Sequence, residues 1–280
     1  MAISRRSLLG TGGAAILSRL LAARSRGLKI GVTDWNLRLT GKVEAVETAA
    51  RLGFDGVQVS LGRKPADGRL PLDDLATQQQ YLTASKIHSI PIDGTCLDIL
   101  HVNYLKNDKL GQKWVADSIP ITKKLNARVI LLPFFGKGAL TSRDEMDYVG
   151  DILREIAPAA EKAGVILGLE DTISAEDNVH IMERTKSPVV LTYYDVGNST
   201  EGGFDVVKEI RWLGRDRICQ IHLKDNPHYL GEGKIDFPAV LKAIEDIGFH
   251  GFANLETSCP SNSVEDDMTR NLHFIRRLLG

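Results

Sequence analysis

Cysteine is scarce in this chain of 280 residues, which contains only Cys96, Cys219 and Cys259. The three lie far apart, and no two have the Cys-x-x-Cys spacing of metal and redox motifs. A sparse, odd set argues against a disulfide framework and against a zinc finger. The fold is therefore expected to rest on a hydrophobic core, for which 43% hydrophobic residues are sufficient.

An excess of one charge is lacking as well. The formal net charge is −1, from 35 Lys and Arg against 36 Asp and Glu, so no general basic field exists to attract nucleic acid. No apolar run reaches the length of about 20 residues that a membrane-spanning helix needs. We therefore expect neither a nucleic-acid partner nor a stable membrane span, and the sequence leaves the formation of a homo-oligomer open.

The first 27 residues differ in kind from the rest. Segment 4–10 reads Ser-Arg-Arg-Ser-Leu-Leu-Gly, and a small, apolar run over 11–17 follows it. This layout is typical of a twin-arginine export signal, with 21–23 as a candidate cleavage site. We therefore expect 1–27 to be a signal or tail outside the fold, on a protein exported to the periplasm. A basic tail on a cytoplasmic protein is the alternative.

From residue 28 onward, short apolar and β-branched segments alternate with longer helical ones. Eight segments are predicted to be strands: 28–33, 56–60, 92–96, 128–132, 165–170, 189–195, 218–223 and 252–256. The clearest predicted helices are 42–52, 144–163, 237–247 and 264–279. Gly53, Gly164 and Gly248 are expected to end helices, because glycine adopts the left-handed conformation that turns the chain back.

Strict alternation predicts parallel strands with the helices outside them. Eight units over 28–280 average roughly 31 residues each, which is the usual size in a (β/α)₈ barrel. A doubly wound open sheet would carry a glycine-rich phosphate turn after its first strand, and residues 30–35 contain none. The sequence therefore predicts one domain over 28–280, a (β/α)₈ TIM barrel.

Four polar residues lie at the ends of four consecutive predicted strands: Glu170, Asp195, His222 and Glu256. The carboxyl ends of barrel strands meet on one face, where the catalytic groups of such enzymes lie. Singly, an acid after a strand is often a helix cap and a histidine is often structural. Together, three carboxylates and one imidazole suit Mn²⁺, Mg²⁺, Co²⁺ or Zn²⁺ with open coordination positions. The sequence predicts a site for one divalent metal ion.

The sequence around the same strand ends is similar to that of a known protein family. Segments 167–170, 195–198, 222–225, 231–237 and 254–256 resemble those of the xylose isomerase-like superfamily of sugar phosphate isomerases and epimerases, the endonuclease IV-like barrels. The run from His222 to Phe237 is most similar to L-ribulose- and L-xylulose-5-phosphate 3-epimerases, inosose dehydratases and hydroxypyruvate isomerases. Within it, Glu232 is expected to be loop structure more than a pocket lid, and Asp236 to cap the following helix.

This resemblance implies that the four strand-end residues bind the metal ion. It also implies that Glu170 and Glu256 lie on opposite faces of the substrate, where one takes a proton next to a carbonyl and the other returns it. Asp195 and His222 are then ligands only. The implied activity is isomerisation or epimerisation of a sugar or sugar phosphate through a metal-stabilised enediolate.

Other residues near the strand ends are candidates for substrate binding. Trp35 and Phe134 can stack on a sugar, although aromatic residues more commonly pack in the core. Lys224 is placed to neutralise an oxyanion or a phosphate, with an ion pair to Asp225 as the alternative. Gln58 stands where relatives often carry Glu. The full set is Trp35, Gln58, His101, Phe134, Asn198 and Lys224, with Arg38, Arg63 and Lys137 as loosely placed phosphate ligands.

Three other functions are alternatives for a barrel of this kind. A dehydratase or lyase acting on an inosose or 3-keto sugar would use the same fold and site. A barrel that binds a polyol without turnover is the non-catalytic alternative, against which the pair Glu170 and Glu256 argues. An endonuclease IV-like nuclease needs additional histidine ligands and a basic surface, which seven His and a net charge of −1 do not supply. Export favours an unphosphorylated carbohydrate.

Overall fold

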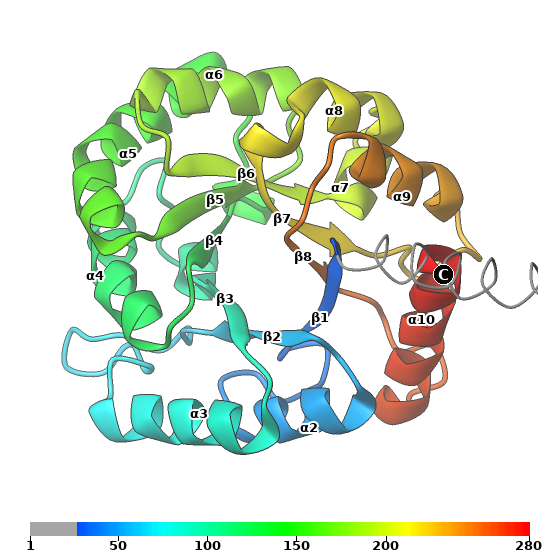
Figure 1. Ribbon diagram of the computed structural model, residues 1–280. Coiled ribbons are helices and arrows are strands. Elements are labelled where there is room, and N and C mark those ends of the chain that lie inside the picture. Colours follow the sequence, from blue (N-terminus) through cyan, green and yellow to red (C-terminus); the bar gives the residue numbers. More distant parts are fainter. Residues whose placement is uncertain (1–26) are drawn as a thin grey trace, which may run out of the picture.

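The computed structural model describes residues 27–280 of the chain. Eight parallel strands pair in sequence order, and β1 closes the ring by pairing with β8. Figure 1 looks along the barrel, with the strands around the centre and the helices outside them. The predicted single (β/α)₈ barrel is confirmed. The expected export signal lies outside the described residues, apart from Gly27.

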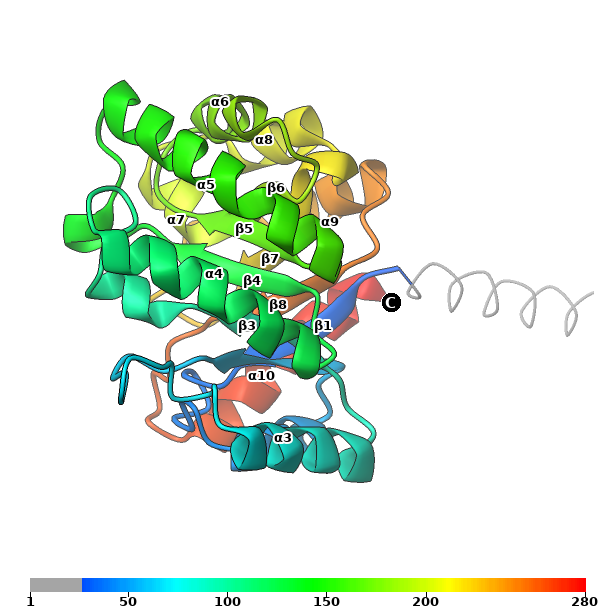
Figure 2. The ribbon, with the colours of Figure 1, turned by 90° about the vertical axis from the view of Figure 1, so that its left-hand side faces the viewer.

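The strands begin and end within one residue of the predicted bounds. They are β1 (Lys29–Thr33), β2 (Gly56–Ser60), β3 (Ile92–Cys96), β4 (Val129–Pro133), β5 (Ile166–Glu170), β6 (Val190–Asp195), β7 (Ile218–Leu223) and β8 (Phe252–Leu255). Figure 2 views the barrel from the side, with the carboxyl ends of the strands to the left. All eight ends therefore open onto one face.

Helices and short 3-10 turns connect the strands. The helices are α2 (Glu44–Leu52), α3 (Leu75–His88), α4 (Lys109–Lys124), α5 (Arg143–Ala163), α6 (Ala175–Thr185), α7 (Val196–Glu201), α8 (Val206–Leu213), α9 (Phe237–Asp246) and α10 (Val264–Leu279). The 3-10 turns are η1 (Asp98–His101), η2 (Gly136–Gly138) and η3 (Arg215–Arg217). As predicted, Gly53 and Gly164 end helices in the left-handed conformation, and Asp236 caps α9. In the outer layer, α10 contacts both α9 and α2.

A polar layer fills the barrel interior toward the amino-terminal ends of the strands. Asp93 Oδ1 on β3 accepts hydrogen bonds from Gln220 Nε2 at 3.2 Å and from Asn254 Nδ2 at 3.0 Å. Gly31 makes room for this layer, because a Cβ there would lie 2.1 Å from Asn254 Oδ1 and 2.4 Å from Asp93 Oδ2. Between residues 27 and 280, no helix has the length and apolar character needed to cross a membrane.

Candidate metal centre

The four residues predicted to bind a metal ion lie together at the carboxyl end of the barrel. Glu170 ends β5, Asp195 ends β6, His222 is the last residue but one of β7, and Glu256 directly follows β8. Each offers one ligand atom, and these four atoms lie within 4.8 Å of one another. The first three residues are buried and Glu256 is half-buried. The fold thus brings the predicted set to one point.

His222 lies at the centre of this cluster. Its Nδ1 is 2.7 Å from Glu170 Oε1 and 3.6 Å from both Asp195 Oδ2 and Glu256 Oε2. Its Nε2, on the other side of the ring, is 3.0 Å from Gln58 Oε1. The three carboxylates therefore surround a single imidazole nitrogen. Three oxygen donors and one nitrogen donor around one point fit a divalent cation with positions left for substrate oxygens.

Asp195 ends β6 and also caps α7. Its Oδ1 accepts hydrogen bonds from the backbone N–H groups of Gly197 and Asn198, at 2.8 and 2.9 Å. These bonds leave Oδ2 to face the cluster. Gly197 must be small, because a Cβ there would lie 2.5 Å from Lys224 Cγ. The Asp-Val-Gly-Asn segment thus provides a candidate ligand, a helix cap and the space through which Lys224 reaches the site.

Lys224 forms ion pairs with two of the candidate ligands. Its Nζ lies 2.8 Å from Asp195 Oδ2 and 2.7 Å from Glu256 Oε2, and its side chain is 13% exposed. The alternative ion pair with Asp225 is not formed. Instead, the Asp225 carboxylate organises the following loop by accepting hydrogen bonds from the backbone N–H groups of Gly231, Gly233 and Lys234.

Burial and charge act in opposite directions on these groups. Burial raises the pKa of Glu170 to about 8, although the charge of His222 opposes the shift. Burial acts the same way on Asp195, but Lys224 and His222 outweigh it and hold the pKa of that carboxyl well below its usual range. For His222, burial opposes the charged form, yet the carboxylates of Glu170 and Glu256 raise its pKa to about 10. The carboxylates therefore stabilise a positive charge placed among them.

The cluster lines a cavity of about 540 Å³ at the barrel mouth. From β5–β8 and the loops after them come Glu170, Asn198, Lys224 and Glu256. The other strands and the loops after them supply Trp35, Thr40, Arg63, Cys96, Asp98, His101, Leu131, Pro133 and Phe135. This size suits a small-molecule site.

Four of the residues predicted to bind substrate line this cavity: Trp35, His101, Asn198 and Lys224. Trp35 Nε1 donates a hydrogen bond of 3.0 Å to Glu256 Oε1, so that both oxygens of Glu256 are held by donors. Asn198 is 7% exposed, and its Nδ2 has no hydrogen-bond partner in the described part of the chain. Asn198 is therefore a donor available to a ligand.

Two of the residues predicted to bind substrate, Phe134 and Gln58, do not line the cavity. Phe134 is 1% exposed and belongs to the hydrophobic core. Its neighbour Phe135 lines the cavity and stacks on His101, with the ring centroids 6.1 Å apart. Gln58 is fully buried next to His222 and is not among the residues that line the cavity. Neither Phe134 nor Gln58 is placed to touch a substrate in this cavity.

Asp98, which is not among the residues predicted from the sequence, faces the same cavity from η1. Its carboxylate is 4% exposed, and Ser60 Oγ donates a hydrogen bond of 3.0 Å to its Oδ1. Burial raises the pKa of Asp98, while Ser60 and the nearby Arg63 oppose that shift. A signal was present in the sequence. Asp98 follows the predicted strand 92–96 by two residues. It therefore lies close to the end of a strand, which is the property by which Asp195 and Glu256 were predicted.

Only one of the three residues considered for phosphate binding lines the cavity. This is Arg63, which is exposed. Arg38 instead donates hydrogen bonds to Asn262, and Lys137 is exposed away from the lining. Among the described residues of the lining, the other cationic side chain is Lys224, which is already paired. No cluster of cations faces the cavity within residues 27–280.

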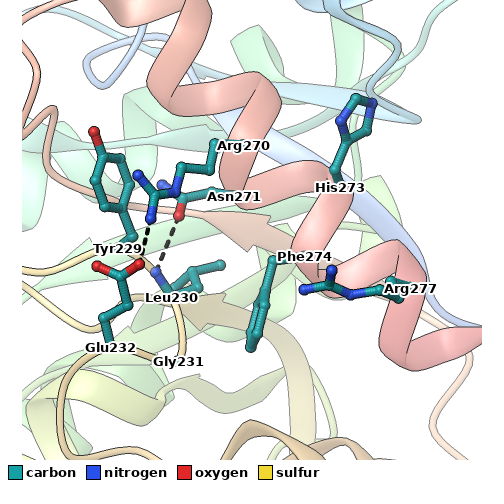
Figure 3. Close-up of a pocket in the computed structure, with 9 residues that line it drawn as sticks. All are labelled: Tyr229, Leu230, Gly231, Glu232, Arg270, Asn271, His273, Phe274 and Arg277. Atoms are coloured by element: carbon teal, nitrogen blue, oxygen red, sulfur yellow. Dashed lines mark hydrogen bonds and ion pairs between the residues drawn. The ribbon is translucent and has the colours of Figure 1, made fainter.

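A second cavity, of about 420 Å³, lies between the loop after β7 and α10 (Figure 3). Glu232 lines it and forms an ion pair with Arg270, whose guanidinium lies 3.7 Å from the centre of the Tyr229 ring. Leu230 N donates a hydrogen bond of 3.0 Å to Asn271 Oδ1 and ties the loop to α10. Glu232 therefore stabilises this loop and lies apart from the candidate metal ligands.

Fold and site together define a (β/α)₈ barrel with a candidate divalent-metal centre. The chain belongs to the xylose isomerase-like TIM barrel family, whose sequence profile matches residues 46–278. It is 25% identical over 206 residues to a 2-epi-5-epi-valiolone 7-phosphate 2-epimerase from Actinoplanes sp., over 71% of this chain and 73% of that protein. It is 24% identical over 235 residues to a fructoselysine 3-epimerase from Shigella flexneri, over 76% and 83% of the two chains.

Solved structures share the fold. The structure of D-psicose 3-epimerase with D-tagatose, from Clostridium cellulolyticum H10, superposes with a TM-score of 0.75. The match covers 90% of this chain and 99% of that one, at 17% sequence identity. At this level of identity the likeness is one of architecture.

Proposed function

We propose that this protein is a divalent-metal-dependent epimerase or isomerase of an unphosphorylated sugar. One observation carries the proposal. Glu170 and Glu256 both line the cavity, come from different parts of the strand ring, and place carboxylate oxygens in the same 4.8 Å cluster. A sugar bound over the cluster has a carboxylate available on two sides. The relatives described above, which are epimerases by name, support the assignment.

The metal ion would be held by Glu170, Asp195, His222 and Glu256. The donor set suits Mn²⁺, Mg²⁺, Co²⁺ or Zn²⁺. When bound, such an ion supplies stabilisation for the negative charge that develops on substrate oxygens as a proton leaves the neighbouring carbon. The other steps fall to the side chains of the protein.

Proton transfer is assigned to the two glutamates. One carboxylate removes the proton from the carbon next to the carbonyl, and the other returns a proton to the opposite face, which inverts that carbon. Trp35 and Lys224 fix the Glu256 carboxylate through hydrogen bonds of 3.0 and 2.7 Å. Glu170 is oriented by its contact with His222. Asn198 Nδ2 donates to a substrate hydroxyl.

The far side of the cavity indicates the class of substrate. Asp98 offers a buried carboxylate that accepts hydrogen bonds from hydroxyl groups, and His101 and Arg63 stand beside it. A phosphate dianion would meet this carboxylate with one arginine to balance it, whereas phosphate sites use several charged or N–H donors. We therefore propose that a hydroxyl-rich, unphosphorylated end of the sugar lies against Asp98.

Export is proposed on the sequence of segment 4–10. A protein carried out of the cytoplasm meets unphosphorylated carbohydrate, which agrees with the cavity. Replacing Arg5 and Arg6 by lysine is expected to retain the protein in the cytoplasm, as measured by cell fractionation. An unchanged distribution would favour the basic-tail alternative.

Hydrogen exchange tests the activity directly. The metal-loaded protein is incubated in D₂O with a panel of ketoses and keto-sugars and their phosphorylated counterparts, and NMR follows the products. We expect deuterium at one inverted carbon of an unphosphorylated sugar. Exchange accompanied by loss of a hydroxyl would assign a dehydratase or lyase instead. Binding without exchange across the panel would assign a carbohydrate-binding barrel.

A further inference from the structure

We propose that Gln58 is a positioning residue that fixes the tautomer of His222 required for metal binding. Gln58 is the third residue of β2 and is fully buried, and its Oε1 lies 3.0 Å from His222 Nε2. This contact lies on the side of the imidazole ring away from the three carboxylates. The inference rests on the metal site of the proposed function, and it is independent of the substrate.

A neutral imidazole carries its proton on one of its two nitrogens, and the other nitrogen holds the lone pair that binds a metal ion. In His222 the nitrogen that faces the carboxylates is Nδ1. Metal binding therefore requires the proton on Nε2. The amide oxygen of Gln58 only accepts hydrogen bonds, so that its place beside Nε2 favours this tautomer.

A second neighbour also contacts the oxygen of the Gln58 amide. Tyr193, on β6, donates its hydroxyl hydrogen to Gln58 Oε1 at 3.1 Å. The centroid of its ring lies 4.6 Å from the centroid of the His222 ring. Both contacts of the amide thus run through its oxygen. Gln58 Nε2 has no partner within the described residues. A reversed amide would donate to His222 Nε2 and force the proton onto Nδ1, where the metal ion must bind.

The barrel supplies an internal comparison. Gln220 lies on β7, two residues before His222, and is 1% exposed. Its Nε2 donates to Asp93 Oδ1, toward the other end of the barrel. Gln58 and Gln220 are therefore buried glutamines in the same barrel, and only Gln58 contacts the metal-binding histidine.

Three variants distinguish the effect of Gln58 on His222 from a general loss of barrel stability. Gln58→Leu removes the acceptor, and the expected result is Mn²⁺ binding weaker by about 10- to 100-fold, measured by titration calorimetry. Gln58→Glu restores an acceptor oxygen and is expected to bind at least as tightly as the wild type. Gln220→Leu, the matched control, is expected to keep wild-type affinity. Unchanged affinity in Gln58→Leu, or an equal loss in Gln220→Leu, would overturn the role of Gln58.

A measurement on the wild type keeps the inference testable even where Gln58→Leu fails to fold. Long-range ¹H–¹⁵N NMR of the Zn²⁺-loaded protein reports which nitrogen of His222 carries the proton, and the resonance is assigned by its loss in His222→Asn. We expect the proton on Nε2, and a proton on Nδ1 would overturn the inference. Wild-type protein that binds no divalent cation would overturn the metal site itself, a different result from an intact site that is indifferent to Gln58.

Discussion

The ammonium group of Lys224 lies 2.7 Å from Glu256 Oε2, so the residue proposed as a proton carrier forms an ion pair with the lysine that directly follows β7. The same ammonium is 2.8 Å from Asp195 Oδ2. Lys224 thereby places a positive charge beside two of the proposed metal ligands.

Replacing Lys224 by methionine should therefore lower the stability of the metal-free protein and enlarge the effect of metal. Breaking a buried ion pair costs about 3–5 kcal/mol, and we expect about 2 kcal/mol here because Glu256 is partly exposed to solvent. Thermal unfolding with and without Mn²⁺ measures both quantities. The rise in Tm on adding Mn²⁺ should be larger in Lys224→Met than in the wild type, with Lys224→Arg as the charge-conserving control. Equal rises would contradict the charge-sharing role.

The two-carboxylate scheme makes an asymmetric prediction for isotope exchange. At saturating Mn²⁺, Glu170→Gln and Glu256→Gln should each abolish epimerisation, because one of the two proton transfers is lost. Each variant should still exchange the proton of one epimer with D₂O, and the two variants should differ in which epimer exchanges. Glu232→Gln, a change in the separate second cavity, should behave as the wild type. Full turnover in either cavity variant would rule out the scheme.

Asp98→Asn should weaken the binding of substrate more than it slows the reaction. Hydrogen bonds to charged groups contribute about 1.5–3 kcal/mol, which corresponds to a KM higher by roughly tenfold or more. We expect kcat to change little, since Asp98 faces the cavity but is not part of the metal cluster. Ser60→Ala removes the hydroxyl that holds Asp98 and should give a smaller change of the same kind. A fall in kcat at constant KM would place Asp98 in the chemistry instead.

The position of the strand ends was predictable from the sequence because a barrel is built from regularly alternating strand and helix segments. Parallel strands of similar length bring their carboxyl ends to one face, so Glu170 and His222 could be placed together without coordinates. The partner of Lys224 was not predictable in this way. Lys224 and Asp225 are adjacent in sequence, but Lys224 reaches Asp195 across the sheet and Asp225 turns to its own loop.

For other residues, the position at which a strand ends determines the direction in which the side chain points. β4 continues to Pro133, one residue beyond the predicted end, and Phe134 N donates a hydrogen bond to Glu170 O. Because side chains alternate along a strand, this register turns Phe134 into the core and leaves Phe135 to the cavity. The same alternation, combined with the packing of Tyr193, turns Gln58 toward His222. Such contacts depend on several strands at once.

The polar layer at the other end of the barrel predicts how stability depends on pH. Burial raises the pKa of Asp93 from 3.8 to about 7, although hydrogen bonds from Asn254 and Gln220 oppose the shift. Neither Asp93 Oδ2 nor Asn254 Oδ1 has a hydrogen-bond donor within the described residues. Both atoms lie within 2.4 Å of the position that a Cβ on Gly31 would occupy, so they are close neighbours. A proton on Asp93 Oδ2 would turn this atom into a donor beside the acceptor Asn254 Oδ1, so the neutral acid is the form that fits the folded barrel.

Since the folded state holds this proton more tightly than the unfolded state, the contribution of Asp93 is fully present below about pH 4 and is lost as the pH rises through about 7. The slope approaches roughly 1.4 kcal/mol per pH unit between these limits. Asp93→Asn carries an N–H group in place of the acid O–H, and should lack this dependence. Urea unfolding in EDTA from pH 4 to 8 should show the variant gaining on the wild type as pH rises and exceeding it at pH 8. Parallel curves would show that Asp93 is already charged in the folded barrel.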